Sequence, residues 1–131
     1  MNWMRFAGVV IGAGVVTSFT DWFFAGDWIH KRFSYPEIWR EGSETKAVVV
    51  VSILPFVTAA VFAVLVWRFD VASLRNCVKL ALAVWTMAVL PMILANAAFI
   101  KLHRVFTVLY ATGWLVKLLI VAVAVAKFLH F

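Results

Sequence analysis

Four long apolar runs constrain the fold of this chain more than any other feature of its sequence. They occupy residues 6–26, 47–67, 80–100 and 105–126. A helix needs about 20 mostly apolar residues to cross a bilayer, and each run has this length. We therefore predict an all-α membrane protein, a bundle of four transmembrane helices that forms a single integral membrane domain over residues 1–131.

The composition supports this assignment and excludes an ordinary water-soluble domain. Hydrophobic residues make up 66% of the chain and charged residues 14%, whereas a soluble domain is about 45–50% apolar. The net charge of +6 would also suit a nucleic-acid-binding protein. Here the basic residues lie at the ends of the apolar runs, where they meet lipid headgroups. We therefore expect the lipid bilayer as a partner and no nucleic acid.

The sequence leaves the orientation in the membrane undetermined. We name the side that holds both chain ends and the 68–79 loop side A, and the opposite side B. The positive-inside rule compares Lys and Arg on the two sides, and here they are nearly balanced. Side A carries Arg5, Arg68, Arg75, Lys79 and Lys127, and side B carries Lys31, Arg32, Arg40, Lys46, Lys101 and Arg104.

The first connection, residues 27–46, mixes aromatic and charged residues as interfacial segments do. Within it, Ser34 and Glu37 have the spacing of a capping box. The segment predicts a short interfacial helix at about 35–41. Its expected anchors at headgroup depth are Trp28, Tyr35 and Trp39.

Polar side chains within the four runs gather in the half of the membrane that faces side B. Thr17, Asp21, Asn96 and Tyr110 fall in this half, and Lys117 lies near the centre. The other half is almost wholly Val, Ala, Leu and Ile. This pattern predicts a polar cavity that opens to side B and is closed toward side A. It disfavours an open channel, because a pore needs a polar lining or a gate along its whole length.

Asp21 and Lys117 need an explanation, because a charge at the centre of a transmembrane helix costs about 2.5–3.5 kcal/mol. Lys117 lies about 14 Å from the side A end of its helix, too far to reach water comfortably. Side chains lean toward the N-terminus of their own helix, so on antiparallel first and fourth helices these two lean toward each other. We predict a direct or water-bridged ion pair between them. The accompanying cavity residues are Thr17, Asn96, Tyr110 and Trp114.

Two other interpretations of these charges stay open. Asp21 could cap the end of its helix at the interface, or pair with Lys31 or Arg32 of the following loop. A buried pair could also fix the register of the helices without taking part in any chemistry.

Two further patterns bear on packing and on cofactors. Gly8 and Gly12 have GxxxG spacing, which lets helix backbones approach closely, either inside the bundle or in a dimer. The histidines show no HxxxH or Glu-x-x-His pattern, so we predict no metal site and no cofactor. Axial ligation of a haem or pigment by His103 or His30 stays open. No catalytic motif is present, so we expect no enzyme and assign no catalytic residue.

The stretches TDWFFAGDWIHKRFSYPEIWR, NAAFIKLHR and GWLVKL resemble small four-helix bacterial membrane proteins of domain-of-unknown-function family 1761. The resemblance runs from about Gly8 to Lys117. That family has an aromatic W-Y-S/T-P type segment late in helix one, where this chain has SFTDWFFAGDW without a proline. The resemblance implies an integral membrane protein of bacterial origin and brings no established activity with it.

Two classes of function follow from these observations. The first is a non-enzymatic accessory or structural subunit, or a binding module, that packs against membrane partners or lipid. The second is a small ion-coupled secondary transporter that uses Asp21, Asn96 and Lys117 in the one-sided cavity. We favour the first, because the dry half gives no second opening. We expect a homo-oligomer or a larger membrane complex in the bacterial inner (cytoplasmic) membrane.

Overall fold

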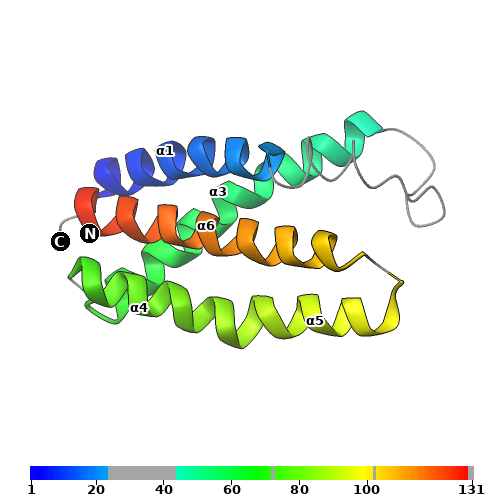
Figure 1. Ribbon diagram of the computed structural model, residues 1–131. Helices are drawn as coiled ribbons and strands as arrows, with labels where there is room; N and C mark the ends of the chain where they lie inside the picture. Colours follow the sequence, from blue (N-terminus) through cyan, green and yellow to red (C-terminus); the bar gives the residue numbers. More distant parts are fainter. Residues whose placement is uncertain (24–43, 72, 102, 130–131) are drawn as a thin grey trace.

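The computed structural model describes residues 1–23, 44–71, 73–101 and 103–129. All regular structure in these residues is helical (Figure 1). The elements in chain order are α1 (Trp3–Asp21), α3 (Glu44–Arg68), α4 (Leu74–Val84), the π-helical segment η2 (Trp85–Val89), α5 (Leu90–Phe99) and α6 (Arg104–Phe128). Because α4, η2 and α5 run on as one helix, the described residues contain four helices that are long and apolar enough to cross a membrane. The predicted number of such helices is therefore confirmed.

All four helices begin before the predicted apolar runs, at Trp3, Glu44, Leu74 and Arg104, and polar side chains cap the starts of α1, α4 and α6. The Asn2 side chain accepts from the backbone N–H groups of Met4 and Arg5. Ser73 caps α4 by accepting from the N–H of Asn76. Side-chain acceptors at this position satisfy N–H groups that a helix start leaves unpaired. Because these first turns carry polar residues, hydropathy places the start of each helix too late in the sequence.

The predicted interfacial helix at 35–41 and the anchors Trp28, Tyr35 and Trp39 lie outside the described residues. The same holds for residues 24–26 at the end of the first predicted run. These expectations stay predictions.

A tight turn reverses the chain between α3 and α4. The N–H of Val71 donates to the carbonyl of Val66 at 2.9 Å, and the N–H of Asp70 donates to the carbonyl of Trp67 at 3.3 Å. Asp70 has a φ of 52°. This is a Schellman ending, in which Asp takes the left-handed position that Gly usually occupies. The turn lies at the end of the bundle where α1 begins and α6 ends (Figure 1).

Helix α6 is the centre of the bundle. It packs against α1, α3, α4 and α5, and α1 also packs against α3. Its buried residues recur at intervals of four, at Gly113, Lys117, Val121 and Val125. The core around them consists largely of small side chains, including Val9, Ala13, Ala59, Ala63, Ala81 and Ala122. Small residues let helices approach closely where lipid removes the hydrophobic drive between them.

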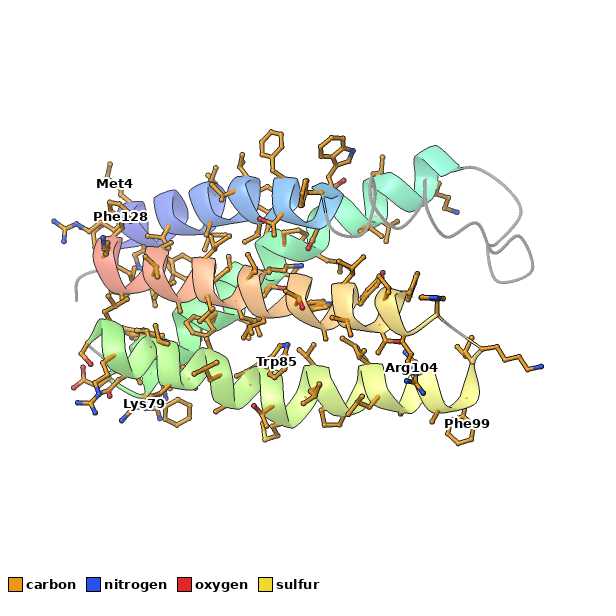
Figure 2. The ribbon with its side chains drawn as sticks, viewed as in Figure 1. Met4, Lys79, Trp85, Phe99, Arg104 and Phe128 are labelled. Atoms are coloured by element: carbon orange, nitrogen blue, oxygen red, sulfur yellow. The ribbon has the colours of Figure 1, made fainter. Side chains whose placement is uncertain are left out.

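The π-helical segment η2 ends two residues before Pro91. A proline has no N–H, so the carbonyl of Met87 loses its usual donor, and the ring crowds that carbonyl. In the structure, the N–H of Leu90 reaches back five residues to the carbonyl of Trp85. Wide turns of this kind are rare within α-helices and bend the helix locally. Here the turn carries Trp85, which points toward α6 (Figure 2).

The indole of Trp85 joins the third span to the backbone of α6. Its Nε1–H donates to the carbonyl of Ala111 at 2.9 Å. We expect Trp85→Phe to lower the free energy of unfolding by about 0.5–1.5 kcal/mol, because this bond is lost while most of the ring packing remains. Trp67→Phe, on the exposed end of α3, is the matched control and should change stability by less than about 0.5 kcal/mol. Unfolding in mixed micelles measures both; equal losses would contradict a role for the bond.

Candidate functional site

The two intramembrane charges meet directly between α1 and α6. Lys117 Nζ donates to Asp21 Oδ2 at 2.8 Å. Asp21 is the last residue of α1, and Lys117 lies in the middle of α6. The two helices run in opposite directions, so each side chain leans toward the other. The ion pair expected from depth and lean is present, and it forms without a bridging water.

The two partners differ strongly in exposure. The side chain of Lys117 is 3% exposed, and that of Asp21 is 28% exposed. Lys117 also lies over the ring of Trp114, with 4.2 Å from Nζ to the ring centroid. Trp114 precedes Lys117 by three residues, so both project from the same face of α6. The ammonium is therefore held in a dry position, and the carboxylate is the partner that the surroundings can reach.

Thr17 lies one turn before Asp21 on α1 and is fully buried. Its hydroxyl donates to the carbonyl of Ala13 at 2.6 Å and approaches that of Gly14 at 3.2 Å. Ser18 bonds Gly14 in the same way at 2.7 Å. Hydroxyls used in this manner satisfy themselves within their own helix. The position of Thr17 beside the pair is as expected, but its hydroxyl proton is already bonded.

Tyr110 lies on the same face of α6 as Lys117, two turns before it, and packs against the core. Its ring stacks on Phe106 with 5.3 Å between centroids and 25° between planes. Together with Trp114, these rings make the side of the pair that faces the start of α6 largely aromatic. We refer to Thr17, Asp21, Tyr110, Trp114 and Lys117 as the α1–α6 polar cluster.

Asn96 is not brought to this cluster. Its side chain is exposed on α5, and α5 packs against α6. The expectation rested on depth alone, since Asn96 and Asp21 lie at nearly the same level. Depth does not decide which way a side chain points around its helix, and here α5 turns this residue outward.

Within the bundle, the close contact of α1 with a neighbouring helix is at Gly14 and not at Gly8 or Gly12; a contact of these two glycines in a dimer stays a prediction. A Cβ built on Gly14 would overlap the ring of Phe56 on α3. A Cβ on Gly8 or Gly12 would meet nothing within 4 Å. The GxxxG spacing identified the correct helix, but within this chain the two glycines line an open groove. No spacing signal distinguishes Gly14 in the sequence.

His103, one of the two candidate axial ligands, caps α6. Its Nδ1 accepts from the N–H of Val105 at 3.2 Å, which occupies the nitrogen nearest the backbone. His30 lies outside the described residues. Among the residues that the structure describes, no three His, Cys, Asp or Glu side chains form a group that could hold a metal ion.

Comparison of the chain with family models, with curated proteins and with solved structures found no match. The resemblance to family 1761 therefore stays a prediction, and any functional assignment depends on the geometry described above.

Proposed function

We propose that this chain is an integral protein of the bacterial inner membrane that works as a non-enzymatic accessory or structural subunit. In this proposal, the α1–α6 polar cluster holds the bundle together. The lipid-facing surface is where partners pack, in a homo-oligomer or a larger complex. The interfacial segment after α1 anchors the chain at the headgroups.

The observation that carries this proposal is the closed state of the cluster. Lys117 is 3% exposed at its side chain and already has a carboxylate and an aromatic ring as partners. The Thr17 hydroxyl is bonded to its own helix. An ammonium in that position joins two helices. A polar group that binds and releases a solute would instead need to be accessible to that solute.

The outer surface supports the same proposal. Along α3, large apolar side chains are exposed on successive turns; they are Val49, Val50, Val51, Ile53, Leu54, Val57, Val61, Val64 and Trp67. In a bilayer such a surface contacts lipid or other apolar helices; Ser52 is an exposed polar residue within it.

One observation favours the alternative of a small ion-coupled transporter. The Asp21 side chain is 28% exposed beside a dry lysine. A carboxylate that can be reached from one side, next to a buried cation, is an arrangement that proton-coupled carriers use. In that case Asp21 would exchange its partner during transport.

Extraction of the chain from its native membrane in mild detergent tests the proposal. We expect an assembly in which this 14.7 kDa chain is present in fixed stoichiometry with another membrane protein. A colourless homo-oligomer that binds a solute with a pH dependence abolished by Asp21→Asn would support the transporter instead. A visible chromophore in the purified assembly would overturn both. The Asp70→Asn variant, altered in the α3–α4 turn, controls for a general effect of removing an acid.

A further inference from the structure

A groove of about 700 Å³ runs along the surface between α1 and α6, at the end of the bundle where α1 begins and α6 ends. Met4 and Phe128 mark this end in Figure 2. The floor of the groove is formed by small residues, which are Gly8, Gly12, Ala13 and Ala124. Gly8 and Gly12 have open space where a side chain would begin, because a Cβ added at either position meets no atom within 4 Å. A larger residue at either position would extend into the groove.

The length of the groove along α1 matches the hydrocarbon thickness of one membrane leaflet. On α1 its lining extends from Arg5 to Val16, which is about 16 Å along the helix axis at 1.5 Å per residue. The hydrocarbon core of a bilayer is about 30 Å thick. A narrow apolar channel of half that length, open along its side to lipid, fits an acyl chain lying parallel to the helices.

Two cations lie at the outer end of the groove. Arg5 and Lys127 belong to its lining, one on each helix. Both side chains are exposed, and within the described part of the chain neither has an acidic partner. Their charges therefore lie at the level where a lipid headgroup would be, above an apolar floor.

The geometry points to a binding site for an anionic phospholipid, with one acyl chain in the α1–α6 groove and its phosphate between Arg5 and Lys127. Basic side chains at this depth attract anionic headgroups, and the apolar floor adds the contact of the chain. This site is separate from the α1–α6 polar cluster and does not depend on the proposed function.

A helix of a second copy is the other occupant that the groove could take, because GxxxG glycines also serve dimers. Charge favours lipid over this occupant. Two copies packed in parallel through the groove would bring two Arg5 and two Lys127 side chains to one level, where they would repel one another. None of the described residues that line the groove is an Asp or a Glu that could neutralise them. A lipid phosphate neutralises the same pair of cations.

Native mass spectrometry of the full chain in delipidated detergent tests the site. The probes are phosphatidylglycerol and phosphatidylcholine with identical acyl chains. We expect the Arg5→Gln/Lys127→Gln variant to bind phosphatidylglycerol about 30-fold more weakly, about fivefold for each cation. Phosphatidylcholine should lose clearly less, because its choline cation offsets the charge of its phosphate. Arg75→Gln/Lys79→Gln removes two exposed cations of α4 that do not line the groove, and should change neither lipid by more than about twofold.

A second variant tests the groove itself. A Cβ on Gly12 meets no neighbour within 4 Å, so Gly12→Leu extends a side chain into the groove. It should weaken both lipids by about tenfold, the loss expected when roughly two methylene groups leave an apolar site. Val15→Leu, on the exposed face of α1 outside the lining, is its control. Undiminished phosphatidylglycerol binding in Gly12→Leu would overturn the proposal. So would equal losses in the two double variants, or a change of Gly12→Leu from dimer to monomer with lipid binding intact.

Discussion

Replacing Asp21 with Leu should lower the free energy of unfolding by about 3–5 kcal/mol, the cost of leaving one member of a buried ion pair without its partner. The orphaned group would be Lys117, whose side chain is 3% exposed and cannot turn to water. Its neighbour Trp114, 4.2 Å away, offers only partial compensation. Unfolding in mixed micelles, followed by the far-ultraviolet helix signal, measures this loss.

Replacing the other partner, Lys117, should lower the free energy of unfolding by less. Lys117→Met leaves the carboxylate of Asp21, which is 28% exposed and can recover hydration, so we expect a loss of about 1.5–3 kcal/mol, the value of one charged hydrogen bond. The double variant Asp21→Leu/Lys117→Met should return to within about 1 kcal/mol of the original chain, because apolar pairs replace buried ion pairs without loss. Lys79→Met, exposed on α4, is the control.

This asymmetry makes the prediction specific. Equal losses in the two single variants would mean that both groups are equally shielded, contrary to their exposed fractions. A double variant as unstable as the sum of the singles would mean that the two side chains do not interact.

The second large effect is expected at Gly14. Gly14→Ala introduces a Cβ that would overlap the Phe56 ring, and overpacking of this kind costs about 1–3 kcal/mol. The same change at Gly8 or Gly12 meets no neighbour and should stabilise the helix by up to about 1 kcal/mol through propensity alone. Since the propensity gain is common to all three sites, the difference between Gly14 and Gly12 isolates the contact with α3.

The same unfolding measurement checks this series. Phe56→Leu in the Gly14→Ala background should restore part of the lost stability by making room for the new methyl group. A Gly14→Ala variant as stable as Gly12→Ala would show that α1 and α3 do not approach closely at this point.

The sequence predicts the spans and the ion pair for the same reason, the low polarity of the bilayer. A run of about 20 apolar residues has few alternatives to a spanning helix, and an isolated lysine at mid-depth must find a partner. Depth and the lean of side chains were enough to pair Lys117 with Asp21. Both arguments concern position along the helix axis.

Position around the helix axis is where sequence reasoning fails. In a soluble helix the polar face points outward, but α1, α3, α5 and α6 are apolar on nearly all sides, so periodicity does not tell the core from the lipid face. Asn96 and the glycines of α1 illustrate this. Asn96 has the depth of Asp21 but projects away from it, and within the bundle the close contact of α1 is at Gly14 and not at Gly8 or Gly12. Trp85, which bonds to α6, lies in the π turn that precedes Pro91. The proline marks the position of this turn in the sequence, but not the face that the widened turn presents to α6.

The most direct test of the account is a distance measured in a lipid bilayer by solid-state nuclear magnetic resonance. The chain is labelled with ¹⁵N at the lysine ammonium and ¹³C at the aspartate carboxylate, and Lys117→Met provides the background from other lysines. We predict strong dipolar dephasing between Lys117 Nζ and the Asp21 carboxylate, as the direct 2.8 Å contact requires. Dephasing of the Asp21 carboxylate signal that persists unchanged in Lys117→Met would mean that Asp21 pairs with another lysine, such as Lys31 of the following loop, and would contradict the account.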